Sequence, residues 1–216
     1  MKKVYFITAT NTNIGKTTAS EIFLKKFAKD GYRVGYFKPI ETGVVSEAED
    51  GVKLLKLAQT LNKDFNVTID DVVPFQFYLA AAPFVASNGK HIDIDIIKQK
   101  QQYLLKFCDI LIIEGAGGLM VPINNNYFIY NLIQDLAPTK TILISPSHLG
   151  SINDTLLSQY LLNQHNINYD WYINLYKDIK EFEKITLPFY KTYFKENSQV
   201  ALGKIRYLQD ILKEGK

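Results

Sequence analysis

The segment 8-TATNTNIGKTTAS-20 contains the residues best suited to phosphate chemistry. It follows the apolar run 4-VYFI-7, and its Gly-Lys-Thr sequence matches the end of a phosphate-binding loop. Backbone N–H groups of such a loop and of the helix after it converge on phosphate oxygens. Gly15 lets the backbone approach closely, Lys16 is expected to span the β- and γ-phosphates, and the Thr17 hydroxyl is expected to bind Mg²⁺. The alternative is a glycine turn before a solvated lysine. It is disfavoured because the preceding strand, the following helix and the position near the N-terminus all agree with a phosphate-binding loop.

The spacing of this loop is unusual. The residue expected to be glycine at its head is Ala9, and five residues separate it from Gly15, where the common motif has four. Alanine at position 9 predicts that the backbone there does not need a positive φ angle.

Metal binding needs a carboxylate near this loop, and 108-CDILIIEGAGGLMVP-122 supplies one. Four apolar residues precede Glu114, so we expect it to emerge at the carboxyl end of a buried strand, the edge where open α/β sheets bind ligands. The residues that follow, Gly115 to Gly118, lack bulk, so their backbone can lie against a substrate. Glu114 is therefore a candidate Mg²⁺ ligand, and the alternative is an ordinary acid before a flexible turn.

Two further segments carry candidate residues. In 36-YFKPIETG-43, Lys38 ends the second predicted strand and is expected to reach the same edge of the sheet as Lys16, with Thr42 and Gly43 in a small polar loop. In 46-SEAEDGVKLLKLA-58, an acidic turn leads into a helix. Asp50 or Glu49 could face the metal, although acids at such positions also cap helices.

Short apolar runs alternate with amphipathic segments along the chain, which predicts βαβ units around a mostly parallel sheet with helices on both faces. Strands are expected at 4–8, 33–38, 109–114, 140–145 and 169–174, each hydrophobic almost throughout. Helices are expected at 16–30, 93–107 and 151–164, the last with Ser151 as its N-cap. The lysine-rich tail beyond Asn174 is expected to be a partly helical cover. We therefore predict a three-layer α/β fold of the P-loop NTPase type and one domain over residues 1–216.

Composition excludes several other classes of protein. Apolar residues make up 47% and charged residues 22% of the chain, and a formal net charge of +3 gives no indication of a nucleic-acid partner. No stretch is long and apolar enough for a signal peptide or membrane span, and Cys108 alone cannot form an internal disulfide. We expect a cytoplasmic protein in which Cys108 is a core residue. His91, His148 and His165 do not have a metal-ligand spacing.

Together these segments resemble the dethiobiotin synthetases over about four-fifths of the chain. That family has the same five-residue spacing before Gly-Lys-Thr. The other matching segments are Lys38-Pro39 with Thr42-Gly43, Asp50 before a helix, 114-EGAGG-118 and 149-LGSIN-153. The resemblance implies ATP-dependent closure of a cyclic urea on 7,8-diaminononanoate with CO₂ or bicarbonate, through a carbamate and its phosphoric anhydride.

The resemblance also implies roles for individual residues. Lys16 and Lys38 stabilise charge in catalysis, with Thr12 and Thr42 at the carbamate or diamine end. Mg²⁺ is held by Thr17, Asp50 and Glu114. The residues that bind ATP are Asn13, Ile14, Gly15, Lys16, Thr17, Thr18, Asp50, Glu114, Gly115, Ala116, Gly117 and Asn174. The substrate carboxylate is bound by Gly150, Ser151, Ile152 and Asn153 at the start of a helix that comes from the other subunit, which implies a homodimer with its substrate site at the interface.

The chain departs from the family pattern at several places. Besides Ala9, Asn11 stands where Asp is common and Asn13 where Glu is frequent. Asn174 matches the residue that contacts the base, but Leu175 follows it in place of Asp, and the proline-containing adenine loop is not recognisable.

Two alternatives of other classes share the phosphate loop. A ParA/MinD-like ATPase switch would carry a signature lysine near the head of the loop, and residues 9–14 contain none. An amidoligase module of corrinoid synthesis would bring a glutaminase domain, for which 216 residues leave no room.

Overall fold

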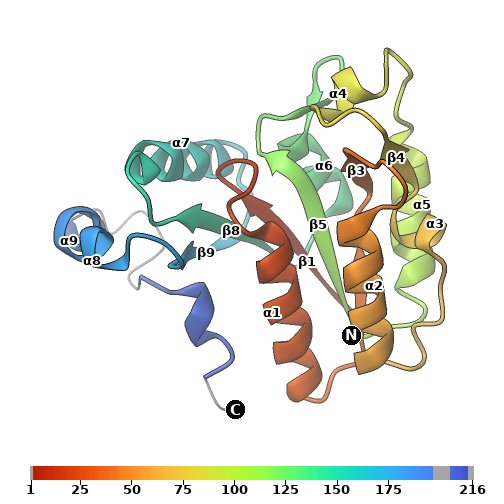
Figure 1. Cartoon of the computed structure of the whole chain (residues 1–216), viewed down its shortest axis with the longest axis horizontal. Coiled ribbons are helices and arrows are strands. Elements are labelled where there is room, and N and C mark those ends of the chain that lie inside the picture. Colours follow the sequence, from red (N-terminus) through yellow and green to blue (C-terminus); the bar gives the residue numbers. More distant parts are fainter. Residues whose placement is uncertain (1, 197–204, 214–216) are drawn as a thin grey trace.

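A five-stranded parallel sheet forms the centre of the computed structural model, which describes residues 2–196 and 205–213 (Figure 1). Its strands lie in the spatial order β2 (Val34–Phe37), β5 (Ile110–Gly118), β1 (Lys3–Ala9), β8 (Lys140–Pro146) and β9 (Tyr169–Asn174). Every neighbouring pair is parallel. All five strands were predicted, because an apolar run buried on both faces is visible in sequence.

Helices cover both faces of this sheet. Their bounds are α1 (Lys16–Lys29), α2 (Glu49–Leu61), α5 (Ile94–Leu104), α6 (Ile129–Leu136) and α7 (Ser151–Gln164). In Figure 1, α1 and α2 lie in front of the sheet, whereas α5 and α6 lie behind it. The predicted three-layer α/β fold of the P-loop NTPase type is confirmed. That residues 1–216 form one domain stays a prediction.

Shorter elements complete the described chain. They are β3 (Ile40–Thr42), α3 (Ile69–Val72), β4 (Phe75–Phe77), α4 (Pro83–Ala86), β6 (Pro122–Asn124) and β7 (Tyr127–Phe128). After β9 come α8 (Ile179–Glu181), a π-helical turn (Phe182–Thr186), α9 (Leu187–Glu196) and a 3₁₀ turn (Leu208–Asp210). The described part of the tail is thus partly helical, as predicted. None of the described helices has the length and apolar character needed to cross a bilayer.

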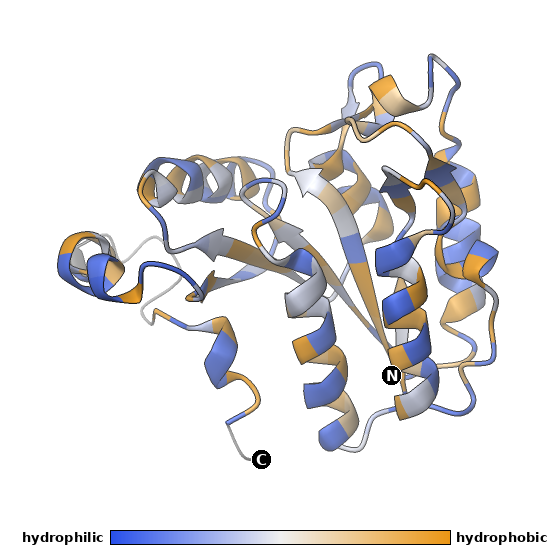
Figure 2. Ribbon diagram, in the orientation of Figure 1, coloured by the Kyte–Doolittle hydropathy of each residue, from blue (hydrophilic) through white to orange (hydrophobic). Residues whose placement is uncertain are grey.

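The hydrophobic core lies on both sides of the sheet. Figure 2 shows strands of mostly apolar colour and helices α1 and α2 whose colour alternates around the axis. Phe6, Phe37, Ile112 and Trp171 are completely buried. Burying such side chains stabilises the fold by about 1.5–3 kcal/mol each.

Three local expectations were wrong. Strand β5 does not end at Glu114 but continues to Gly118. A Cβ at position 118 would stand 2.9 Å from the Thr10 carbonyl oxygen, so this close approach of the two backbones needs a glycine. Thr42 lies in strand β3, paired with β4, and not in a loop. Gly150, with φ 91°, is the N-cap of α7, so Ser151 is its first helical residue. Glycine takes that left-handed conformation without a Cβ clash.

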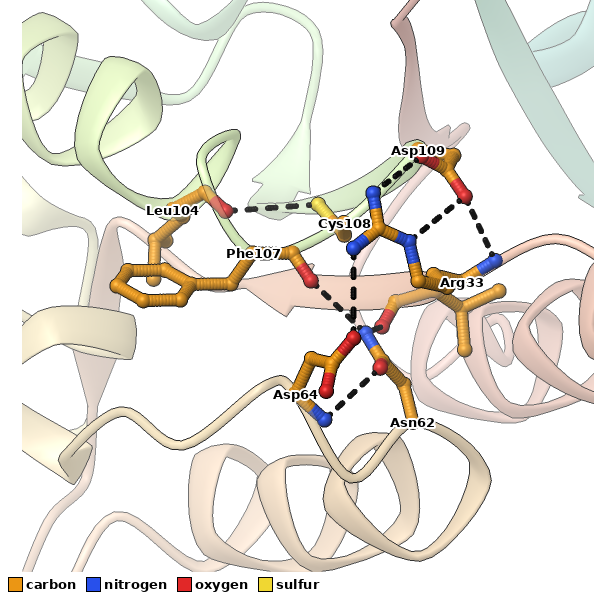
Figure 3. A network of polar contacts seen from close by, with 8 residues as sticks. Arg33, Asn62, Asp64, Leu104, Phe107, Cys108 and Asp109 are labelled. Atoms are coloured by element: carbon orange, nitrogen blue, oxygen red, sulfur yellow. Dashed lines mark hydrogen bonds and ion pairs between the residues drawn. The ribbon is translucent and has the colours of Figure 1, made fainter.

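At the amino ends of the strands, a polar network connects the starts of β2 and β5 to the end of α2 (Figure 3). The Arg33 guanidinium donates to both oxygens of Asp109, at 3.1 and 2.8 Å, on a half-exposed surface where such pairs contribute little. The Asn62 amide is buried and donates to the carbonyls of Val34 and Phe107 at 2.9 and 3.0 Å. Cys108 lies in this core, where burial raises the pKa of its thiol to about 12.

Replacing Asn62 with alanine is expected to lower the free energy of unfolding by about 2–3 kcal/mol, because the carbonyls of Val34 and Phe107 each lose a hydrogen-bond donor. Urea denaturation measures this change. Asn125→Ala, at an exposed turn position, is the matched control and should stay within about 0.5 kcal/mol of the parent. Equal stability of the two variants would contradict a structural role for Asn62.

Candidate active site

The predicted phosphate loop connects β1 to α1. Ala9 is the last residue of β1 and does not have a positive φ, whereas Asn13 and Gly15 do, at 60° and 102°. A Cβ on Gly15 would stand 2.3 Å from the Asn174 amide nitrogen, so glycine is required for space as well as for conformation. The first turn of α1 contains no acidic residue, which leaves the positive end of the helix free for an anion.

Both lysines and both predicted acids line one cavity of about 780 Å³ at the end of this loop. The Lys38 ammonium lies between the two acids, 2.8 Å from Glu114 Oε1 and 2.9 Å from Asp50 Oδ2. The Thr17 hydroxyl donates to Glu114 Oε1 at 3.0 Å. Segments far apart in sequence thus bring a hydroxyl, two carboxylates and an ammonium together.

The charges of this cluster support one another. Burial lowers the pKa of Lys38, but Glu114 and Asp50 outweigh it and the net pKa is raised. Burial likewise raises the pKa of Asp50, and the Lys38 charge reverses this, leaving the pKa below its usual value. Lys16 differs: burial lowers the pKa of its ammonium to about 8, with Glu114 opposing. Its ammonium donates to the Asn11 carbonyl at 3.1 Å and, in the part of the chain that is described, makes no ion pair.

Asp50, and not Glu49, faces the cavity. Glu49 is exposed and does not line it. The carboxylate of Glu41 accepts the backbone N–H groups of Asp50 and Gly51, at 3.1 and 3.0 Å, and so holds the first turn of α2. Sequence reasoning missed Glu41; the signal was that α2 begins after Ala48, which has no capping side chain.

The remaining cavity wall is partly polar and partly apolar. Thr12 and Thr42 line it, as do Asn13 of the phosphate loop and Gly115 to Gly117. Small apolar side chains, Ala80, Ala81, Ala82, Pro83 and Val121, form another part of the wall.

Comparisons with known proteins give the same assignment as the motifs. A family model described as "AAA domain" matches residues 3–171. The protein named ATP-dependent dethiobiotin synthetase BioD of Sulfurovum sp. (strain NBC37-1) is 46% identical over 190 residues, 88% of this chain and 90% of the relative. The chain belongs to the dethiobiotin synthetase family. Its Helicobacter pylori (strain Shi470) relative of the same name is 36% identical over 97% of this chain and 96% of the relative. The resemblance inferred from sequence is confirmed.

Solved structures share the fold only. A plasmid partition protein from Borrelia burgdorferi superimposes with a TM-score of 0.54, covering 98% of both chains at 16% identity. This likeness to a partition protein reflects the common P-loop fold and does not favour the ATPase-switch alternative over membership of this ligase family.

The donor set of this dethiobiotin synthetase-family site fits a magnesium ion. Two carboxylates and a hydroxyl are hard oxygen ligands, and the Lys38 ammonium between the carboxylates indicates a place that attracts a cation. Within the described ranges, no cluster of three or more His, Cys, Asp or Glu side chains is placed to hold a metal. Mg²⁺ is usually held by one or two carboxylates together with substrate phosphates.

Three groups of predicted residues do not line the cavity. Ile14 and Thr18, next to Asn13, Gly15 and Thr17, are the first. Gly150 to Asn153, at the start of α7, do not line the cavity. Asn174 lies behind the phosphate loop, where its amide donates to the Ile14 carbonyl at 2.9 Å and accepts from Gln209 at 2.9 Å. These two contacts orient the Asn174 amide. Gln209 was not anticipated, because the tail has no readable periodicity.

Ser20 and Tyr36 were also missed. Their hydroxyls donate to Glu114 Oε2 at 2.7 and 3.0 Å, and both side chains are completely buried. A polar residue on the inner face of a helix and a tyrosine in a buried strand were the available signals, but neither names its partner.

Replacing Lys38 with alanine is expected to tighten binding of a divalent cation in the absence of nucleotide by about tenfold, because the ammonium no longer competes for Glu114 and Asp50. Calorimetric titration with Mn²⁺ measures the affinity. Lys56→Ala, an exposed substitution on α2, is the control. Weaker Mn²⁺ binding by the Lys38 variant would contradict competition between lysine and metal.

Proposed function

We propose that the protein converts 7,8-diaminononanoate, CO₂ and ATP into dethiobiotin by closing a cyclic urea across the two amines. The observation that carries the proposal is the single cavity lined by Lys16, Lys38, Asp50 and Glu114. Its small apolar wall suits the alkyl chain of such a substrate. Membership of the dethiobiotin synthetase family supports the same assignment.

The proposed reaction has three steps. A neutral amine attacks CO₂, forming an N–C bond and releasing its proton, to give a carbamate. A carbamate oxygen then attacks the γ-phosphorus of ATP as the bond to ADP breaks. The second amine attacks the carbamate carbon, loses its proton, and phosphate leaves with the electrons of the C–O bond.

The lysines act electrostatically in this scheme. Negative charge builds on the carbamate and on the transferring phosphoryl group, and Lys16 and Lys38 line the cavity where both must lie. Thr12 and Thr42 offer hydroxyls to the carbamate or diamine end. Backbone N–H groups of the phosphate loop from Asn13 through Thr18 hold the triphosphate. Gly115 to Gly117 are proposed to contact the nucleotide, and Asn174 its base.

Magnesium is proposed to be held by Thr17, Asp50 and Glu114. Mg²⁺ would neutralise charge on the β- and γ-phosphate oxygens. For this, the carboxylates must exchange the Lys38 ammonium for the metal, which leaves Lys38 available to the carbamate.

We further propose a homodimer in which the start of α7 serves the partner's cavity. Leu149, Leu157 and Tyr160 leave an apolar surface on and beside α7, with exposed fractions of 83%, 62% and 63%. Tyr78 and Phe84 are exposed apolar residues next to the Ala80–Pro83 cavity wall. Contact between these two surfaces would place Gly150 to Asn153 near the substrate of the other chain.

Mixing a Lys16→Ala variant with an Asn153→Ala variant is expected to restore about a quarter of the parent activity, since half of randomly mixed dimers carry one intact site of two. Each variant assayed alone is the control. If each chain instead builds its own complete site, the mixture will recover no activity.

The reaction itself is tested by measuring ATP hydrolysis and incorporation of labelled bicarbonate, with and without the diamine. ATP turnover should depend on both the diamine and bicarbonate, with one phosphate released per labelled product. ATP hydrolysis that proceeds equally without the diamine would favour the ParA/MinD-like switch.

A further inference from the structure

The two oxygens of Glu114 have different surroundings. Oε1 accepts hydrogen bonds from Thr17 and Lys38, which both line the cavity. Oε2 accepts from Ser20 at 2.7 Å and Tyr36 at 3.0 Å, and neither of these residues lines the cavity. One oxygen of the carboxylate is therefore turned towards the site and the other away from it.

The oxygen turned away from the cavity, Oε2, has no free lone pair. A carboxylate oxygen offers two lone pairs, and two hydroxyls occupy those of Oε2. Both hydroxyls come from rigid places: Ser20 is on the buried face of α1, and Tyr36 is in β2, in register with Ile112 of the neighbouring strand. Tyr36 and Ser20 are completely buried, so water does not replace them.

We propose that Tyr36 and Ser20 are positioning residues that make Glu114 a one-oxygen metal ligand and thereby favour Mg²⁺ over Ca²⁺. Ca²⁺ takes more ligands at longer distances and often binds both oxygens of one carboxylate. Mg²⁺ has an octahedral shell and needs only one oxygen from a carboxylate. Holding Oε2 away from the cavity removes the second oxygen that Ca²⁺ would use. The inference rests on the proposed role of Glu114 as a metal ligand.

The test uses Mn²⁺ as a probe and measures its binding to the full chain by electron paramagnetic resonance. A non-hydrolysable ATP analogue is present and the protein is in excess. Mg²⁺ and Ca²⁺ are titrated in to displace it. Tyr36→Phe keeps the ring and removes the hydroxyl. The ratio of Ca²⁺ affinity to Mg²⁺ affinity should therefore rise by about fivefold, which corresponds to the free energy of one lost hydrogen bond. Ser20→Ala should act in the same direction, and the double variant more strongly.

Tyr190→Phe is the matched control, because this buried hydroxyl donates to Thr155 at 3.1 Å and Tyr190 does not line the cavity. Its Mg²⁺ to Ca²⁺ ratio should equal that of the parent. An unchanged ratio in both Tyr36→Phe and Ser20→Ala, with Glu114→Gln weakening Mn²⁺ binding, would overturn the inference and leave the proposed function standing. Undiminished Mn²⁺ binding by Glu114→Gln would instead remove the metal role of Glu114, and the inference with it.

Discussion

Lys16→Ala is expected to lower the turnover number by roughly 10³-fold or more, because it removes a charge that opposes the phosphoryl group in the transition state. The fold should not suffer. Lys16 is 8% exposed, its ammonium donates to one loop carbonyl, and in the described ranges it has no acidic partner within ion-pair distance. An ammonium buried without a counterion costs free energy, so its removal should leave thermal stability equal or higher.

The measurement is steady-state turnover with saturating ATP, diamine and bicarbonate, together with the unfolding midpoint. Lys25→Ala is the matched control on the same helix, since its ammonium pairs with Glu21 at the surface. Turnover within tenfold of the parent would contradict the catalytic role of Lys16. A midpoint lowered as far as by a core substitution would show that Lys16 serves the fold.

Glu114→Gln is expected to raise the Mg²⁺ concentration for half-maximal rate by about thirtyfold and to lower turnover by about 10²-fold. Thr17, Ser20, Tyr36 and Lys38 all donate to this carboxylate. A glutamine amide has an NH₂ donor in place of one carboxylate oxygen, so some of these four donors lose their acceptor. The Lys38 ammonium also loses one of its two counterions.

A Mg²⁺ titration of the reaction rate gives both numbers. Glu49→Gln is the control: it makes the same chemical change one residue before Asp50, at an exposed acid outside the cavity. Its titration should match that of the parent. If Glu49→Gln shifted the titration and Glu114→Gln did not, the metal would be held at the start of α2 by the residue that the structure places outside.

Much of the site was predictable because its chemistry is written in short segments. Gly15, Lys16 and Thr17 lie in one strand-loop-helix unit, and backbone geometry within such a unit depends on neighbours in sequence. Glu114 lies directly after the apolar run of β5 and Lys38 directly after β2, and parallel strands bring their carboxyl ends to one edge. The wrong end of β5 and the wrong cap of α7 have one cause: glycines permit close contacts and left-handed turns that hydrophobic patterns do not encode.

By itself, the sequence determined the five strands of the central sheet and the helices α1 and α2 beside the site, the phosphate loop with its long spacing, and the family. These follow from hydrophobic period and local motif, which act over a few residues. Only the tertiary structure decided the partners: Tyr36 and Ser20 on Glu114, Glu41 under Asp50, and Gln209 on Asn174. The physical reason is that a buried polar side chain must find its partner wherever strand register and helix packing bring one within hydrogen-bond distance. Residues 36 and 114 meet because β2 lies beside β5, an order of strands that no local pattern specifies.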